Sequence, residues 1–426
     1  MGRTILKRRD KKGRLLNAGE YQKENGMYEY RYKDICGKQR SVYSWRLTAS
    51  DMLPAGKDPC KPLRELETKL IKDLKDGIDT YTAQSSTLNM RFDLYMESKI
   101  NLRRSTRQNY LYMYNKYVRD EIGCMKISDI NYSVLKQFYN SLIIQRGLQP
   151  NTVDALHSVL NPVFETAVWD KLIKTNDCPR VMKTIRQSNG WKTEKKAALT
   201  LEQQQAFMRF LDNSPTYQHW SNLMTVLLGT GMRICECLGL TWNSCDFDEN
   251  AIYVLHTLNY RKQEDGHCGH YVEFTPKTPA GVRTIPMFDE VRTALLNENE
   301  RQIRVGTANT VIDGVGGWVF TNRYGTVYTE ASVNRAIERI RRAYNAEEEQ
   351  KAIAEKRIPF LLPHFTCHQL RHTFCTRLCE NEPRSKIVQT IMGHANIRTT
   401  MDVYAEVENR VKKESVHTIQ GKLFIK

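Results

Sequence analysis

Four short clusters in the second half of the chain hold cationic, imidazole and phenol side chains that can act on a charged ester. They are Arg233 with Glu236 in TGMRICECLGLTW, Lys277 in PKTPAGVRTIP, His368 with Arg371 and His372 in HQLRHTF, and His394 with Tyr404 in MGHANIRTTMDVYAEV. Helix positions three or four apart share a face, so Glu236 is well placed to orient Arg233, and His368 projects beside Arg371. Lys277 lies beside the tip of a predicted hairpin.

Together, these side-chain types suit a phosphodiester. The planar fork of arginine donates two hydrogen bonds to non-bridging oxygens, and two arginines with two imidazoles can enclose the charge of a pentacoordinate phosphorus in place of a metal. A tyrosine oxygen can attack the phosphorus, and a lysine can protonate the leaving oxygen. Free tyrosine has a pKa of about 10, so the site must help to remove its proton. Taken singly, each cluster also has a purely structural explanation, such as an ion pair or a core histidine.

The sequence lacks the motifs of several other chemistries. There is no GxxxxGK[ST] phosphate loop, no HExxH and no paired CxxC. Three Cys/His groupings fit packing or a polar hairpin tip better than metal ligation: Cys235 with Cys237, His267 with Cys268 and His270, and Cys375 with Cys379. The 11 cysteines are odd in number and scattered, which is typical of reduced cytosolic thiols. No apolar run approaches the roughly 20 residues of a membrane span, and the start lacks a signal-peptide pattern, so we expect a cytoplasmic protein.

The elements that must position these residues begin with a basic segment. The chain has a net charge of +16, and residues 1–50 hold 13 Lys/Arg against 5 Asp/Glu, which is half of the excess. Residues 27–36 and 39–47 form a predicted hairpin in which tyrosines alternate with charges, and residues 13–16 add a candidate third strand. The candidate packing residues of this sheet are Tyr28, Tyr30, Tyr32, Val42 and Trp45. Two interpretations remain open: a small domain with a solvated basic face, or a sheet that enters the DNA major groove.

The rest of the chain is predominantly helical. Residues 62–77 predict a connecting helix, and residues 87–176 predict four or five amphipathic helices with a basic side that includes Arg103, Arg104 and Arg107. Short strands are expected at residues 252–258, 271–275, 282–287 and 318–321, with helices from residue 330 onward. The predicted organisation is a β-domain with its connector at 1–78, a helical domain at 84–180, a linker at 181–197, and a third domain at 198–426.

These motifs, in this order, resemble the tyrosine recombinase (phage-type integrase) family, and within it the integrases of conjugative transposons. The resemblance covers essentially the whole chain and is most specific over residues 229–406. The active site of such enzymes is Arg-Lys-His-x-x-Arg-His/Trp-Tyr, and the matching positions are Arg233, Lys277, His368, Arg371, His394 and Tyr404. Glu236 matches the acidic residue that buttresses the first arginine. His372 matches a common residue of the family's LRH segment and is interpreted as packing or supporting the site.

The resemblance implies a multidomain α+β fold. It consists of a small three-stranded β-sheet that binds arm-type DNA sites, a helical SAM-like core-binding domain, and a mainly α catalytic domain with a small antiparallel sheet. The helical and catalytic domains would close around core-site DNA, and the candidate arm contacts are Arg8, Arg9, Arg31 and Arg40. Family members act as tetramers on two duplexes through a Holliday junction, without metal, ATP or another cofactor. Relatives suggest an excisionase and DNA-bending accessory proteins, association with the bacterial nucleoid, and a C-terminal tail that docks on a neighbouring protomer rather than on its own chain.

The resemblance also implies a role for each matched residue. Arg233 and Arg371 would hold the scissile phosphate, His368 and His394 would assist proton transfer and charge stabilisation, Lys277 would protonate the 5′-hydroxyl, and Tyr404 would form a 3′-phosphotyrosine. Two alternatives remain: a type IB topoisomerase, and a non-catalytic sequence-specific DNA-binding regulator. Two DNA-binding domains before the catalytic domain favour recombination over the first, and six filled active-site positions argue against the second. A metal-dependent nuclease would need a carboxylate cluster, for which the sequence offers no recognisable spacing.

Overall fold

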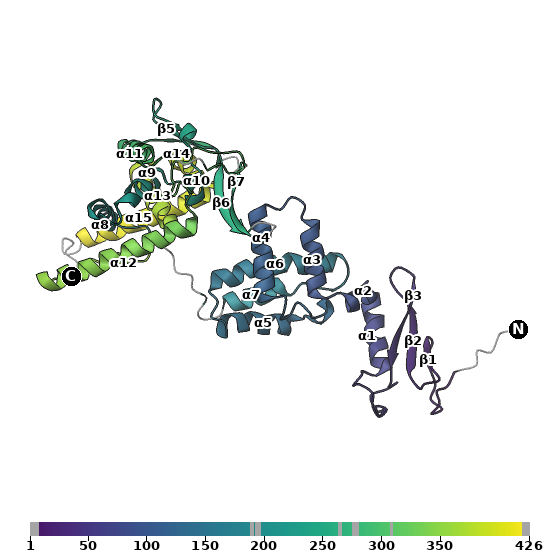
Figure 1. The fold of residues 1–426 in the computed structure, drawn as a ribbon. Helices are drawn as coiled ribbons and strands as arrows, with labels where there is room; N and C mark the ends of the chain where they lie inside the picture. Colours follow the sequence, from purple (N-terminus) through teal and green to yellow (C-terminus); the bar gives the residue numbers. More distant parts are fainter. Residues whose placement is uncertain are drawn as a thin grey trace, which may run out of the picture. The chain divides into compact units, whose positions relative to one another are not determined.

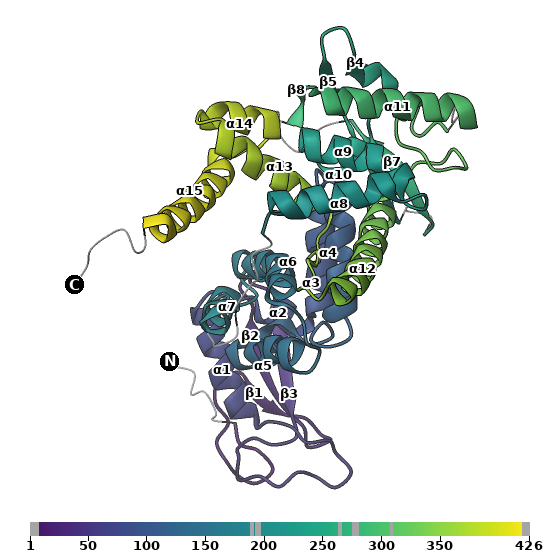
Figure 2. The same cartoon turned by 90° about the vertical axis from the view of Figure 1, so that its left-hand side faces the viewer.

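The computed structural model describes residues 8–187, 191, 197–262, 266–274, 281–306 and 310–419. The chain divides into two compact units, residues 1–194 and 195–426. Figures 1 and 2 show a β-sheet with a helix and then a helical bundle in the first unit, and many helices with two small sheets in the second. The predicted multidomain α+β fold class is confirmed.

The amino-terminal sheet consists of β1 (Glu20–Gln22), β2 (Tyr28–Lys33) and β3 (Gln39–Ser44), which are antiparallel in that order. The predicted hairpin of residues 27–47 is therefore confirmed. One face packs with α1 (Leu63–Lys75) in a small core that contains Leu16, Tyr28, Leu47 and Leu63. Because strand side chains alternate between faces, Arg31 points to the opposite, open face together with Ser41, with which it is paired across the strands.

The third strand is not at residues 13–16, as the sequence predicts, but at β1. Residues 9–15 form a tight loop instead: Asp10 accepts hydrogen bonds from the main-chain N–H groups of Lys12 and Arg14, and only one isolated bridge joins Arg9 to Leu15. Gly19, whose φ is +89°, then turns the chain so that Glu20 pairs with Tyr30. The local carboxylate thus competes successfully with strand pairing for these backbone groups.

The remaining helices of the first unit pack around a second core. They are α2 (Thr80–Ser85), α3 (Leu88–Ser98), α4 (Arg104–Tyr117), α5 (Tyr132–Ile144), α6 (Pro150–Trp169) and α7 (Cys178–Arg186), with a short 3-10 turn at Ile127–Asp129. The apolar stripe of α6 is fully buried, as its periodicity predicts. Helix α7 occupies the first part of the predicted linker, because its Val181, Met182 and Ile185 complete this core.

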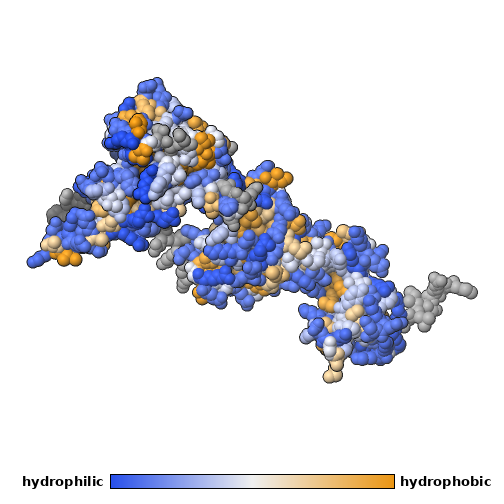
Figure 3. All heavy atoms as spheres, viewed as in Figure 1, coloured by the Kyte–Doolittle hydropathy of each residue, from blue (hydrophilic) through white to orange (hydrophobic). Residues whose placement is uncertain are grey.

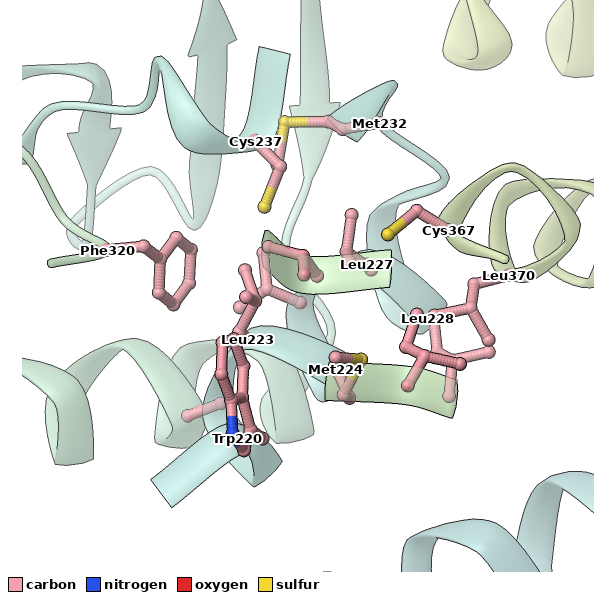
Figure 4. Packing of buried hydrophobic residues seen from close by; sticks show 14 of the residues in the cluster. Trp220, Leu223, Met224, Leu227, Leu228, Met232, Cys237, Phe320, Cys367 and Leu370 are labelled. Carbon is pink, nitrogen blue, oxygen red and sulfur yellow. The ribbon is translucent and has the colours of Figure 1, made fainter. Parts of the chain in front are cut away.

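The second unit is built mainly of helices with two small antiparallel sheets. Its helices are α8 (Leu201–Asn213), α9 (Ser221–Thr230), α10 (Ile234–Leu238), α11 (Asp289–Val305), α12 (Glu330–Glu355), α13 (Cys367–Asn381), α14 (Ser385–Met392) and α15 (Ile397–Ile419). Its strands are β4 (Cys245–Asp246), β5 (Ala251–Val254) and β8 (Arg283–Pro286) in the order β4-β5-β8, and β6 (Thr257–Lys262) paired with β7 (Cys268–Glu273). Figure 4 shows apolar residues of α9, α10 and α13 meeting in the main core.

The strand predicted at residues 318–321 is absent. Trp318, Val319 and Phe320 are buried, but Trp318 makes only an isolated bridge, to Thr241. The side-chain amide of Gln302 donates to the carbonyls of both Trp318 and Val319, at 3.0 and 2.6 Å. A buried side chain therefore satisfies carbonyls that a strand would satisfy by pairing.

In Figure 3 hydrophilic residues dominate the visible face, and apolar residues form separate small groups. No helix within the described ranges is long and apolar enough to cross a bilayer.

Candidate active site

The turn between α9 and α10 presents the first predicted arginine. Helix α9 ends at Gly231 in the left-handed conformation, with φ +60°. Met232 is fully buried, and Arg233 precedes α10 in extended conformation, with 46% of its side chain exposed. The guanidinium of Arg233 is thus accessible at the surface while its backbone is held by the core.

Glu236 lies between two arginines. Its Oε1 accepts from Arg233 Nη1 at 2.7 Å, and its Oε2 accepts from the Arg233 main-chain N–H at 2.8 Å. The same two oxygens accept from Arg283 Nη1 and Nη2, at 3.2 and 2.8 Å. Burial alone would raise the pKa of Glu236, but the hydrogen bonds and positive charge of Arg283, with a further contribution from Arg233, lower this pKa to about 2. The carboxylate is therefore ionised whenever the protein is folded near neutral pH.

Arg371 is buried on α13 and binds main-chain carbonyls. Its Nη1 donates to Gly231 O and its Nη2 to Met392 O, both at 2.6 Å. Burial, followed by repulsion from Arg233, lowers the pKa of Arg371 to about 9, so the group is still protonated at neutral pH. A bound anion stabilises such a buried guanidinium more than an exposed one, because few negative charges surround the buried group.

Three arginines converge on the carboxyl end of α14. Arg283 Nε donates to Ile391 O at 2.8 Å, Arg371 to Met392 O, and Arg233 Nη2 to Gly393 O at 3.3 Å. A helix leaves its last carbonyls without intrahelical partners, and its dipole favours cations there. The three guanidinium groups are therefore fixed relative to one another by three successive carbonyls.

His394 directly follows this helix end. Its Nδ1 lies 2.9 Å from the buried hydroxyl of Thr400, and its carbonyl accepts from the Gln389 side chain at 2.9 Å. Burial, followed by the positive charges of Arg371, Arg233 and Arg283, lowers the pKa of His394 to about 4. The imidazole is consequently neutral at physiological pH.

The other predicted residues of the candidate site differ in their surroundings. His368 is exposed on the first turn of α13 and contributes to the lowered pKa of His394, which places the two imidazoles within electrostatic reach. His372 instead faces α15, where its Nε2 lies 3.6 Å from a Glu406 carboxylate oxygen. Lys277 lies outside the described residues.

Tyr404 lies on α15 in a second, smaller core. It packs with residues of α13, α14 and α15 that include Phe374, Cys375 and Cys379. Its hydroxyl donates a hydrogen bond to the carbonyl of Glu382, just beyond the end of α13. Burial, followed by the neighbouring Cys379 and Glu382, raises the pKa of Tyr404 to about 12. The phenol of Tyr404 is therefore protonated here, and its hydroxyl donates to a main-chain carbonyl.

Arg283 is the residue that the sequence analysis missed. It follows the predicted Lys277 hairpin on β8, where it lies on the same buried face as Ile285. An arginine on the inward face of a short strand is a detectable signal, because charged residues are almost never fully buried without a partner. In the described ranges no group of three His, Cys, Asp or Glu lies where it could hold a metal ion.

The candidate arm contacts differ in their surroundings. Arg8 and Arg31 are exposed and flank the ring of Tyr21, with guanidinium carbons 4.2 and 4.5 Å from its centroid. Arg40 is half-buried against Asp34 and Tyr81, and Arg9 donates to Gly13 O within its own loop. The structure thus brings Arg8 and Arg31 together at Tyr21, although Arg31 also pairs with Glu29 at 3.1 Å, and it gives Arg40 and Arg9 separate partners.

The candidate core contacts lie at the start of α4. Arg103 is the N-cap, Arg104 is the first helical residue, and Arg107 lies one turn on, where its Nη1 donates to Met96 O at 3.2 Å. The helix dipole disfavours cations at this end. These arginines therefore do not stabilise α4 through its dipole.

Comparison with known proteins supplies the family. Residues 197–410 match the phage integrase family, residues 5–74 match the DNA binding domain of tn916 integrase, and residues 87–143 match the phage integrase N-terminal SAM-like domain. The transposase from transposon Tn1545 of Streptococcus agalactiae is 32% identical over 404 residues, which cover 94% of this chain and 93% of the relative.

Solved structures of similar fold include two DNA-bound integrases. The Tn1549 transposon integrase, in complex with circular intermediate DNA, superposes with a TM-score of 0.65 at 28% identity, covering 75% of this chain and 95% of that one. A lambda integrase tetramer bound to a Holliday junction gives a TM-score of 0.51 at 18% identity, covering 90% and 94%, and shows the fold alone. The chain belongs to the phage integrase family of tyrosine recombinases.

Proposed function

We propose that this protein integrates and excises a mobile DNA element by cleaving and rejoining strands through a 3′-phosphotyrosine intermediate. The observation that supports this most directly is the convergence of Arg233, Arg283 and Arg371 beside His394, with Glu236 as the carboxylate bound to two of them. Three guanidinium groups against one carboxylate leave an excess of positive charge, which a phosphodiester offsets. The pentacoordinate transition state is more negative than the ground state, so the same charges favour it further.

In the proposed reaction Arg233 and Arg371 bind the non-bridging oxygens of the scissile phosphate. The Tyr404 oxygen attacks phosphorus, the bond from phosphorus to the 5′-oxygen breaks, and His368 accepts the phenolic proton. Lys277 gives a proton to the leaving 5′-oxygen. When the Thr400 hydroxyl donates a hydrogen bond to Nδ1 of His394, the imidazole proton is on Nε2. The Nε2–H group then donates a hydrogen bond to a phosphate oxygen. A 5′-hydroxyl from the partner duplex later attacks the phosphotyrosine, which reverses these steps.

Tyr404 must change its surroundings for this step. Its hydroxyl must leave the carbonyl of Glu382, and a pKa of about 12 makes it a weak nucleophile where it now lies. Approach to the guanidinium groups of Arg233 and Arg371 lowers the pKa of a phenol, because the phenolate is stabilised by positive charge. Cleavage is therefore coupled to a rearrangement of α15 relative to α13.

We infer two DNA contacts in the first unit. The open face of the β1-β2-β3 sheet, with Arg8 and Arg31, binds arm-type sites, which agrees with the match to the DNA binding domain of tn916 integrase. The arginines at the start of α4 bind core-site phosphates, whose charge compensates the unfavourable position of these cations. The protein acts as a homotetramer with an excisionase and DNA-bending proteins on the bacterial nucleoid in the cytoplasm. The DNA-bound Tn1549 integrase and the lambda integrase tetramer support the DNA-bound and tetrameric parts of this proposal.

A nicked suicide substrate tests the proposal. The substrate contains the core site, and the nick lets the short 5′-hydroxyl fragment diffuse away, so the covalent complex accumulates. Wild type and Tyr404→Phe are incubated with it in EDTA without ATP and separated on a denaturing gel. We expect a protein–DNA band in wild type only. A band that persists in Tyr404→Phe would show that Tyr404 is not the nucleophile. If wild type forms no band on DNA that it is verified to bind, the proposed activity is contradicted.

A further inference from the structure

Arg283 lies outside the six predicted catalytic positions, yet it contacts the supports of two of them. It is on β8, paired with Val254 of β5, and its side chain is only 2% exposed. Its two Nη atoms contact both oxygens of Glu236, and its Nε donates to Ile391 O at 2.8 Å. One guanidinium thus links β8, α10 and the end of α14.

The first link determines how Glu236 holds Arg233. All described hydrogen bonds of the Glu236 carboxylate come from Arg233 and Arg283. The two-pronged contact with Arg283 fixes the plane of the carboxylate, and in that plane Oε1 and Oε2 reach the side chain and the main-chain N–H of Arg233. A rotated carboxylate could not keep both contacts with Arg233.

The second link concerns His394. Ile391, Met392 and Gly393 form the last turn of α14 and the residue after it, and their carbonyls bind Arg283, Arg371 and Arg233 in that order. His394 follows immediately. A shift at Ile391 is therefore transmitted to the carbonyl partners of both phosphate-binding arginines and to the imidazole.

The alternative is that Arg283 only neutralises a buried carboxylate. A lysine could provide that charge, but its single ammonium lacks the fork that contacts Glu236 with two nitrogens while a third nitrogen donates to Ile391. Arg283 uses all three guanidinium nitrogens to contact two different elements, α10 and the end of α14. Neutralisation of the Glu236 carboxylate alone does not require these contacts.

We propose that Arg283 is a positioning residue for strand cleavage: it fixes Glu236, and through it Arg233, and holds the end of α14 that orients His394. This inference rests on the proposed function and deepens it. Arg283 does not touch the DNA in this role; it sets where the phosphate-binding groups lie.

The test is Arg283→Lys in the full-length protein, assayed for single-turnover covalent complex formation on the nicked core site in EDTA. We expect cleavage to fall about 10- to 100-fold, as for a small misplacement of catalytic groups, with core-site affinity changed by less than about threefold. A second substrate has a methylphosphonate at the scissile position. It lacks the charge of one non-bridging oxygen and depends less on an aligned arginine, so we expect the ratio of wild-type to variant rates to fall to about two.

Arg301→Lys is the matched control. Arg301 binds the buried Glu298 at 2.5 Å and donates to the Thr321 carbonyl, so it has the same kinds of partner away from the candidate site. We expect its cleavage rates to stay within about twofold of wild type on both substrates, because the partners of Arg301 do not contact the candidate site. The proposal would be overturned if Arg283→Lys cleaved DNA at the wild-type rate. It would also be overturned if the variant lost cleavage rate equally on both substrates, in proportion to its loss of thermal stability.

A second comparison applies if Arg283→Lys loses its melting transition. Glu236→Gln and the double variant Glu236→Gln/Arg283→Gln both avoid a buried unpaired carboxylate. The proposal expects the double variant to be slower than the single one on the phosphodiester but not on the methylphosphonate. Equal rates on both substrates contradict it. If wild type itself forms no covalent complex, the proposed function fails rather than the role of Arg283.

Discussion

At the residue scale, the surroundings of Arg371 explain why the candidate site favours an anion. A buried cation costs several kcal/mol unless it is well paired, and the described partners of Arg371 are two carbonyls rather than a carboxylate. Its lowered pKa reports the same imbalance. A bound phosphate supplies the missing negative charge, so part of the cost of burial is recovered only when substrate is present.

We therefore expect Arg371→Ala to reduce cleavage about 10³-fold, as for loss of a transition-state donor, while core-site binding changes only a few-fold. The control is Arg377→Ala on the same helix, because Arg377 also donates to a carbonyl, that of Leu199, and pairs with Glu380. The measurement is single-turnover cleavage beside filter binding at one salt concentration. Equal losses of binding and cleavage would contradict a role centred on the transition state.

Glu236 provides a prediction about pH. Its pKa is lowered from 4.5 to about 2, so its contribution to stability is fully present above pH 4.5 and is lost as the pH falls towards 2. The shift corresponds to on the order of 3 kcal/mol. Urea unfolding of wild type and Glu236→Gln should show a gap in the free energy of unfolding at pH 7 that narrows steadily below pH 4.5. A gap of constant size down to pH 3 would refute the ionic role.

At the element scale, the site depends on how closely α13 approaches the end of α9. Gly231 has φ +60°, and a Cβ there would lie 2.3 Å from a ring carbon of Phe374. The carbonyl of Gly231 also accepts from Arg371. The same glycine thus permits the close packing and provides a partner for the arginine.

Gly231→Ala should lower thermal stability and cleavage together, because the clash displaces α13 and with it Arg371. Gly314→Ala is the control: Gly314 has φ +80° but open space around its Cβ position, so it reports backbone strain alone, of about 1 kcal/mol. Differential scanning calorimetry and the cleavage assay measure the two effects. Similar melting temperatures for the two variants would show that the contact with Phe374 is unimportant.

The features of the fold and of the candidate site that can be predicted from the sequence are those that depend on local residue patterns. The buried stripe of α6 and the alternation of β2 and β3 follow from periodicity, and the spacing of three residues places Glu236 on the first turn of α10 beside Arg233 at its N-cap. The sequence analysis missed Arg283 and the hydrogen-bond partner of Tyr404, both of which depend on non-local contacts. Arg283 matters because β8 brings it beside α10, and the Tyr404 hydroxyl binds a carbonyl of Glu382, a group that every residue has.

Three element predictions differed from the structure. The predicted strand at residues 13–16 ends in two leucines, but Asp10 accepts hydrogen bonds from the N–H groups of Lys12 and Arg14, and the segment forms a loop instead. Helix α7 lies in a basic, linker-like segment, yet three apolar side chains spaced along one face bury it. Residues 318–321 have strand-like composition, but Gln302 satisfies their carbonyls. In the first and third cases a single side chain satisfies backbone groups that a strand would pair, and in the second case an apolar stripe buries a helix in a basic segment.

At the scale of the whole molecule, positive charge and chemistry are separated along the chain. Half of the net charge lies in the first 50 residues, whereas the candidate active site lies entirely in the second unit. The first unit also contains a natural point of division: α1 ends at Lys75, and Asp76 and the N–H of Asp79 are held by Lys174 and the carbonyl of Lys171 in the helical part. Removal of residues 1–75 therefore keeps these two contacts and removes the sheet.

We expect deletion of residues 1–75 to eliminate arm-site binding and to spare covalent complex formation on a core half-site. The physical reason is that Arg8 and Arg31 belong to the sheet, while the groups around the phosphate do not. Binding to arm and core DNA should be measured by titration across a range of salt concentrations, because each lost phosphate contact reduces the slope of log K against log salt by about 0.9. The double variant Arg8→Ala/Arg31→Ala in the full chain should reduce the arm-site slope by about 2 and leave the core-site slope unchanged. A truncated protein that binds arm DNA with full affinity would place the arm contacts outside the sheet.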